Sequence, residues 1–160
     1  MLLKLCATEN QITTIVNTNP TRILLIEDDP NDVELIQLAL ENYNFVNQID
    51  VVMDGEQALT YLHGTATASA SPLPRLVLLD LKLPKVDGIQ VLRAIRTHPL
   101  TRELVVVVMT SSAESQDLSA CYDLGVNSYI IKPLDFQQFI EVTRQVGFYW
   151  MMLNHVPSED

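Results

Sequence analysis

Short apolar runs alternate along the chain with segments in which apolar residues recur every three or four positions. A short continuous apolar run is typical of a buried strand, and the longer spacing is typical of one face of a helix. The expected strands are 22–26, 48–52, 76–79, 104–109 and 127–131. Five strands that each precede a helix predict an α/β protein with a doubly wound, five-stranded parallel sheet.

Residues typical of helix ends bound the expected helices. Asp29-Pro30 opens the first helix, because an acid caps the free amides and proline suits the first helical position. This helix is expected to end around 42–44, and its expected apolar stripe is Val33, Ile36, Leu38 and Leu40. The others are expected after Asp54-Gly55, at 88–97, at 114–124 and from about Asp135. Residues 64–74, rich in Thr, Ala, Ser and Pro, are predicted to form a surface loop.

Length and composition predict one domain. A chain of 160 residues with 48% apolar content can bury one sizeable core and is short for two domains. Residues 1–20 are expected to be a poorly ordered N-terminal extension. The folded domain is expected over 21–155, with an extended C-terminal helix, and a tail at 156–160. With no output domain expected after residue 160, the chain is expected to signal through contact with another protein.

Charge and cysteine content narrow the function further. The formal net charge is −10, which repels nucleic acid and anionic lipid, so no nucleic-acid or membrane partner is expected. Cys6 and Cys121 have no disulfide or zinc-ligand pattern, and His63, His98 and His155 are expected at the surface. The chain has no signal-peptide core and no apolar run long enough to cross a bilayer, so a cytoplasmic location is expected.

Polar residues follow four of the expected strands. Glu27 and Asp28 come after the first, Asp80 after the third, Thr110 after the fourth and Lys132 after the fifth. Because the carboxyl ends of parallel strands share one edge of a sheet, these side chains are expected to meet there. Crowded carboxylates raise one another's pKa, and a hard dication relieves this conflict. The sequence therefore predicts a Mg²⁺ site at this edge.

The same residues suit phosphoryl transfer. Asp80 is the candidate nucleophile, because it ends the central apolar strand and a carboxylate can attack the phosphorus of a phosphoramidate. A metal ion held beside it by Glu27 and Asp28 would neutralise charge on the transferring oxygens, as would the ammonium of Lys132. The hydroxyl of Thr110 could donate a hydrogen bond to one of these oxygens.

Five motifs in this order resemble the receiver domains of two-component response regulators. They are Ile26-Glu-Asp-Asp29, Leu78-Leu-Asp-Leu-Lys-Leu-Pro84, Asp87-Gly88, Met109-Thr-Ser111 and Tyr129-Ile-Ile-Lys-Pro133. The separations along the chain from Asp80 to Thr110 and from Thr110 to Lys132 are also those of the family. The resemblance covers about residues 21–153 and implies the flavodoxin-like, CheY-like (βα)5 receiver fold.

The resemblance implies roles for the residues around the acceptor. Asp80 is implied to be the phosphoacceptor, and a histidine kinase is implied to be the donor. Glu27 and Asp28 are implied to hold Mg²⁺, or Mn²⁺ in its place, together with the backbone carbonyl of Lys82. The peptide bond before Pro133 is implied to be cis. The domain would catalyse only its own phosphorylation and dephosphorylation, and would not be an enzyme acting on other substrates.

The resemblance also implies how the signal leaves the site. Thr110 and Tyr129 are implied to be a switch pair, in which the hydroxyl turns towards the phosphoryl group and the aromatic ring swings inward behind it. The phosphoryl group would shift an existing equilibrium between two conformations. A homodimer through the face of the fourth helix, fifth strand and last helix is the expected output.

The C-terminal quarter and the long loop at 64–74 resemble the small receivers paired with cyanobacterial phytochrome histidine kinases. The matching segments are Phe136-Gln-Gln-Phe139, Gly147-Phe-Tyr-Trp150 and Asn154-His-Val-Pro157. This likeness implies a kinase of the phytochrome type. Because residues 148–152 are apolar nearly all round, Phe148, Tyr149 and Trp150 are expected to expose a partner surface, the alternative being plain core of the last helix.

Other interpretations explain less of the pattern. Glu27, Asp28 and Asp29 could simply cap a helix, and Tyr129 could simply pack on the sheet. A receiver-like adaptor that works without phosphorylation, through its aromatic C-terminal surface, is the main alternative function. An aspartyl-phosphate phosphatase would want a second acid at position 82, where this chain has Lys82. A dinucleotide enzyme would need a Gly-rich loop after the first strand.

Overall fold

The structure is a computed structural model that describes residues 22–41 and 48–155. Its strands are β1 (Arg22–Ile26), β2 (Gln48–Val52), β3 (Leu76–Leu79), β4 (Val105–Thr110) and β5 (Ser128–Ile131). Its helices are α1 (Pro30–Glu41), α2 (Gly55–His63), α3 (Gly88–Thr97), α4 (Ser115–Asp123), α5 (Phe136–Phe148) and a π-helical turn, η1 (Tyr149–Leu153). The predicted N-terminal extension 1–20, the end of the first helix at 42–44 and the tail 156–160 lie outside the described residues.

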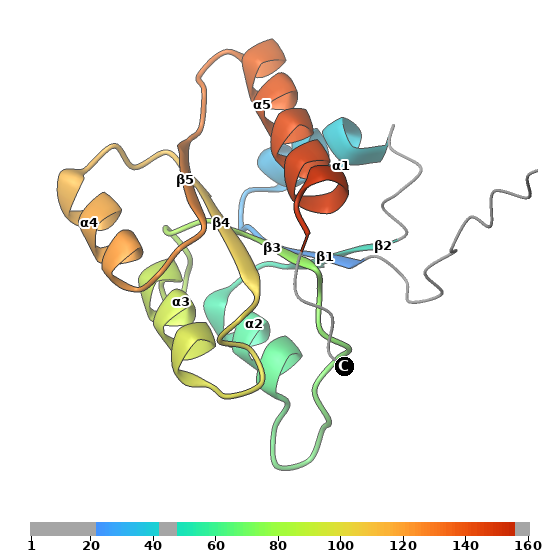
Figure 1. Cartoon of the computed structure of the whole chain (residues 1–160), viewed down its shortest axis with the longest axis vertical. Helices are drawn as coiled ribbons and strands as arrows, with labels where there is room; N and C mark the ends of the chain where they lie inside the picture. The colour runs from blue at the N-terminus through green and yellow to red at the C-terminus, as the bar shows by residue number, and fades with distance from the viewer. Residues whose placement is uncertain (1–21, 42–47, 156–160) are drawn as a thin grey trace, which may run out of the picture.

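All five strands run parallel in the order β2-β1-β3-β4-β5 (Figure 1). The chain adds β2 on one side of β1 and then returns to add β3 on the other side. Open sheets of this kind form their sites at the carboxyl ends of the strands where the order reverses, here β1 and β3. The predicted doubly wound α/β fold is confirmed.

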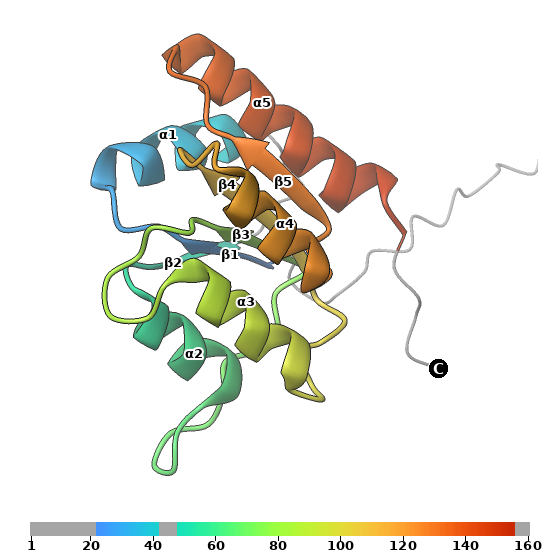
Figure 2. The ribbon, with the colours of Figure 1, turned by 90° about the vertical axis from the view of Figure 1, so that its left-hand side faces the viewer.

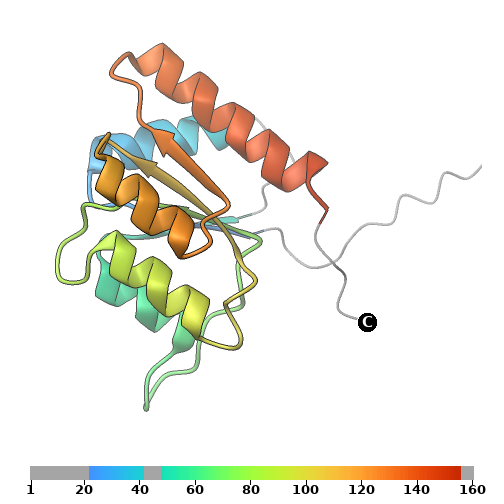
Figure 3. The same ribbon diagram turned by 60° about the vertical axis from the view of Figure 1, so that its left-hand side comes forward.

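Helices cover both faces of the sheet because alternate strand residues point to opposite sides. Leu24 and Ile26 of β1 belong to a core packed against α2, α3 and α4. Ile23 and Leu25 belong to a second core, packed against α1 and α5. Figures 2 and 3 show α1 and α5 together on one side of the sheet and α2 and α3 on the other. Within the described ranges, no helix combines the length and apolar character needed to cross a bilayer.

The buried face of α1 differs from the expected stripe. Ile36, Ala39 and Leu40 are buried, whereas Leu38 is 50% exposed. With about 3.6 residues per turn, positions three and four after Ile36 return to its face, and position two after it does not. The prediction for Leu38 was therefore wrong, because it placed residues two apart on one helical face.

The loop from β3 to α3 packs closely against its surroundings. A side chain on Gly88 would overlap the backbone of Asp80, and one on Gly55 would overlap the backbone of Val86. A capping box at the start of α3 holds the far end of the loop, since the carboxylate of Asp87 accepts from an amide of the first turn. The segment that follows Asp80 is therefore fixed on both sides.

Two histidines stack at the amino-terminal edge of the sheet, where α2 and α3 end. The rings of His63 and His98 are 4.1 Å apart between centroids, with an interplanar angle of 16°. The hydroxyl of Thr101 donates to the carbonyl of Ile95, so it accepts from Nε2–H of His63 at 3.1 Å. Both rings are half-buried, not at the surface as expected. Burial first, and then the neighbouring His98, lower the pKa of His63 below its ordinary value.

We expect His63→Gln to flatten the pH dependence of folding stability on the acid side of neutrality. Because the folded state disfavours protonation of His63, the unfolded chain takes up that proton first as the pH falls. The contribution of His63 is thus present above about pH 6.5, its ordinary pKa, and is lost as the pH falls through the lower folded value. Denaturant unfolding at a series of pH values measures the slope. His155→Gln is the control, and an equal effect of both substitutions would contradict the assignment.

Candidate functional site

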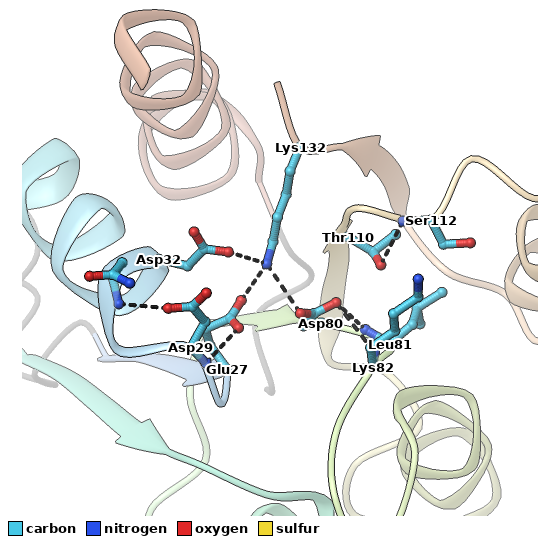
Figure 4. A network of polar contacts seen from close by, with 10 residues as sticks. Glu27, Asp29, Asp32, Asp80, Leu81, Lys82, Thr110, Ser112 and Lys132 are labelled. Carbon is cyan, nitrogen blue, oxygen red and sulfur yellow. Dashed lines mark hydrogen bonds and ion pairs between the residues drawn. The ribbon is translucent and has the colours of Figure 1, made fainter. Parts of the chain in front are cut away.

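The register of the sheet brings the predicted strand-end residues together. Ile26 of β1 pairs with Leu79 of β3, so the residues that follow them, Glu27 and Asp80, lie side by side. The ladder extends by one more bond, in which the amide of Asp80 donates to the carbonyl of Ile26 at 3.0 Å. Figure 4 shows the cluster of polar side chains that results.

Three carboxylates meet at this edge. Oxygen atoms of Glu27, Asp28 and Asp80 all lie within 4.8 Å of one another. Glu27 and Asp80 are 1% and 7% exposed, whereas Asp28 is open to solvent. Burial raises the pKa of Glu27 to about 7, although contact with Lys132 lowers it, and Asp80 adds a smaller upward effect. The predicted convergence of the three acids is confirmed, and burial, with a smaller contribution from Asp80, is what raises the pKa of Glu27.

The ammonium of Lys132 lies within the acidic cluster. Its Nζ donates to Glu27 and Asp32, both at 2.6 Å, and to Asp80 at 3.1 Å. Burial alone would lower the pKa of Lys132, but the hydrogen bonds to Asp32 and Glu27 raise it overall, so the group stays charged. The sequence predicted that Lys132 meets Glu27 and Asp80 but missed Asp32. The available signal was an acid in the first turn of the helix that follows the acidic strand end.

Backbone amides orient the carboxylate of Asp80. Its Oδ1 accepts from the amide of Leu81 at 2.7 Å and from that of Lys82 at 3.4 Å. Its Oδ2 faces Lys132. Because the β3–α3 loop is fixed at both ends, these amides hold the carboxylate in one orientation.

Ser112 links the two predicted switch residues. Its amide donates to Oγ1 of Thr110 at 3.2 Å, and its carbonyl accepts from the hydroxyl of Tyr129 at 3.0 Å. Its own hydroxyl donates to Asp117 of α4 at 2.5 Å. Thr110 is fully buried and Tyr129 is half-buried. A single loop residue therefore connects the end of β4, the aromatic ring on β5 and the start of α4.

The peptide bond between Lys132 and Pro133 is trans, since the described residues contain no cis peptide bond. The expected cis bond was therefore wrong; trans is the favoured isomer before proline by about 0.5–1 kcal/mol. The backbone amide of Lys132 donates to the carbonyl of Thr110 at 2.7 Å. This bond continues the β4–β5 ladder and directs the lysine towards the site.

Comparison with known proteins decides the family. Residues 23–144 match the family model of the response regulator receiver domain. The chain belongs to this family. This receiver domain is 42% identical to the probable methanogenesis regulatory protein FilR2 of Methanothrix harundinacea, over 88% of this chain and 90% of that protein. It is 33% identical to the response regulator Rcp1 of Synechocystis, over 88% of this chain and 97% of Rcp1.

Solved structures agree with this assignment. The receiver domain superposes on the Mn²⁺-bound form of Rcp1 with a TM-score of 0.82, over 87% of this chain and all of that one. It superposes on the phosphorylated cyanobacterial phytochrome response regulator RcpA with the same TM-score of 0.82, at 36% identity, over 86% of this chain and 99% of that one. The resemblance to receivers of cyanobacterial phytochrome systems is thus confirmed in sequence and in fold.

The acidic cluster of this receiver domain fits a hard divalent cation. Glu27, Asp28 and Asp80 each offer a carboxylate oxygen, the type of ligand that Mg²⁺ and Mn²⁺ take. No amide of the described residues donates to the backbone carbonyl of Lys82, which leaves this oxygen available as a further ligand. The donor set therefore suits the ion implied by the family.

The aromatic C-terminal segment is only partly exposed. Phe148 and Tyr149 are exposed, whereas Trp150 packs against the core beneath α1 and α5, and Met151 beside it is buried. The rings of Tyr149 and Trp150 meet edge to face, with centroids 5.0 Å apart. Of the three residues expected to form an exposed patch, Trp150 is thus partly a core residue.

We expect Mg²⁺ to stabilise the domain against thermal unfolding. Binding to the folded state alone adds about 2.7 kcal/mol when the free ion is a hundredfold above its Kd. Asp28→Asn removes a charged ligand at an exposed position and should weaken Mg²⁺ binding by at least about tenfold, with a smaller shift in Tm. Asp29→Asn is the control, because Asp29 offers no oxygen to the cluster. Equal Mg²⁺-induced shifts in both variants would overturn the assignment of Asp28.

Proposed function

We propose that this receiver domain accepts a phosphoryl group on Asp80 from a histidine kinase, in a reaction that depends on Mg²⁺, and signals by protein contact. The main support is the buried ammonium of Lys132 beside the carboxylate of Asp80, within a cluster of acids suited to a divalent cation. Besides a nucleophile, phosphoryl transfer requires mainly positioning and neutralisation of charge from the protein. Asp80 and its neighbours offer both.

In the proposed reaction, a carboxylate oxygen of Asp80 attacks the phosphorus of a phosphohistidine. The new P–O bond forms as the P–N bond breaks. The electron pair of the broken P–N bond stays on the imidazole nitrogen, which takes up a proton. The ammonium of Lys132 stabilises negative charge on the phosphoryl oxygens. A bound Mg²⁺ supplies the remaining neutralisation. Later attack by water at phosphorus breaks the P–O bond to Asp80, releases inorganic phosphate and restores the carboxylate. The domain thus catalyses only its own phosphorylation and dephosphorylation.

The proposed signal passes from the phosphoryl group to Thr110 and Tyr129. A phosphoryl oxygen on Asp80 attracts the hydroxyl of Thr110 as a hydrogen-bond donor. When Thr110 turns, its contact with the amide of Ser112 weakens, and the link from Ser112 to Tyr129 weakens with it. The ring of Tyr129 is then free to move inward, which changes the surface of β5.

The proposed donor is a kinase of the phytochrome type, because this domain is similar to Rcp1 and RcpA along most of its length. The proposed output is a homodimer through α4, β5 and α5. Exposed apolar side chains on these elements support it, namely Leu118, Tyr122, Ile131 and Phe136. The net charge of −10 favours protein over nucleic acid as the partner and is consistent with action in the cytoplasm.

We expect Asp80→Asn to abolish phosphorylation by acetyl phosphate in the presence of Mg²⁺. Removing a nucleophile lowers the rate by at least about a thousandfold. Intact-mass measurement over time follows the added phosphoryl group. Asp87→Asn is the control, because asparagine keeps the helix cap on the same loop, and it should be phosphorylated at the wild-type rate. Phosphorylation of Asp80→Asn at that rate would refute the role of Asp80.

We expect beryllofluoride with Mg²⁺ to raise the mass of the wild-type protein towards that of a dimer in light scattering. Tyr122→Glu places a charge in the proposed interface and should weaken association by about tenfold or more. Leu100→Glu, an exposed position in the α3–β4 loop, is the control. If the protein instead dimerised equally with and without beryllofluoride, and Tyr149→Glu abolished the dimer, the adaptor that works without phosphorylation would be favoured.

A further inference from the structure

The ammonium of Lys132 lies closer to the carboxylates of Glu27 and Asp32 than to that of the proposed phosphoacceptor, Asp80. An ammonium has three N–H donors, and three carboxylates surround this one. Nζ lies 2.6 Å from Oε2 of Glu27, 2.6 Å from Oδ2 of Asp32 and 3.1 Å from Oδ2 of Asp80. Figure 4 shows these contacts, and the one to Asp80 is the longest of the three. All three donors are occupied before any phosphoryl group arrives.

Asp32 is not one of the three carboxylates, Glu27, Asp28 and Asp80, that could hold a metal ion. It lies in the first turn of α1, where the carboxylate of Asp29 caps the amide of Asn31 at 2.8 Å and the carbonyl of Asp29 accepts from Val33 at 3.0 Å. The side chain of Asp32 is 26% exposed, and that of Lys132 is 9% exposed. No oxygen of Asp32 belongs to the group that could hold a cation. Its contact at the site is with the lysine.

We propose that Asp32 is a positioning residue that holds Lys132 towards α1 in the unphosphorylated domain and so opposes the phosphorylated state. The inference rests on the phosphoacceptor role proposed for Asp80. A phosphoryl group on Asp80 brings anionic oxygens that need an N–H of Lys132. Because the donors of Lys132 are already occupied, the new contact forms at the expense of an existing one. The charge-assisted hydrogen bond from Lys132 to Asp32 competes with this new contact, and Asp32 is not among the proposed metal ligands.

Three variants test this inference by calorimetric titration with beryllofluoride at saturating Mg²⁺. Asp32→Asn should bind beryllofluoride about tenfold tighter than the wild type, the order expected for a charge-assisted hydrogen bond that is partly exposed to solvent. Asp32→Glu keeps the charge and should restore affinity close to that of the wild type. Asp29→Asn removes a nearby charge that does not touch Lys132. The beryllofluoride affinity of this variant should differ from that of the wild type by less than about twofold, because solvent and salt screen the charge of Asp29.

A merely structural role for Asp32 has a different signature. If Asp32 served only the first turn of α1, Asp32→Asn would lower the Tm of the ligand-free protein and leave beryllofluoride binding unchanged or weaker. That result would overturn the inference. Equal tightening in Asp32→Asn and Asp29→Asn would also overturn it, because the cause would then be the general field of the pocket. If the wild type bound no beryllofluoride at all, the phosphoacceptor role of Asp80 would be refuted. If the wild type and Asp32→Asn bound beryllofluoride equally well, only the role of Asp32 would be refuted.

Discussion

The site depends on the balance between buried carboxylates and one ammonium at the edge of the sheet. Like charges in a poorly solvated place are unstable unless they are compensated. Lys132 compensates part of the charge of Glu27, Asp32 and Asp80. Burial still raises the pKa of Glu27 to about 7, although contact with Lys132 lowers it, so the compensation is incomplete. The remaining negative charge is what makes this edge suited to a divalent cation.

The fold positions the charged groups of the site on different secondary-structure elements. The register of β1 and β3 places Glu27 beside Asp80, and the β4–β5 ladder directs Lys132 towards them. The β3–α3 loop, which approaches its neighbours closely at Gly88, fixes the amides that orient Asp80. A parallel sheet with fixed loops thus provides the preorganised charges that phosphoryl chemistry requires.

The same arrangement couples the site to the surface. Ser112 forms hydrogen bonds with Thr110, Tyr129 and Asp117, and so it connects the end of β4 with β5 and with the start of α4. Exposed apolar side chains lie on these elements and on α5. The domain is similar to the response regulator Rcp1 and to the cyanobacterial phytochrome response regulator RcpA over most of its length.

The sequence by itself determined the strands, their alternation with helices, the residues that end each strand and the family, because these depend on local periodicity and on motif order. Only the tertiary structure decided that Asp32 meets Lys132, that Ser112 joins Thr110 to Tyr129, and that Trp150 and His63 are half-buried. Asp32 and Lys132 lie far apart along the chain, and neither carries a local sign of the other. Their contact arises because the start of α1 and the end of β5 meet at the carboxyl ends of the strands, and this packing depends on the whole fold.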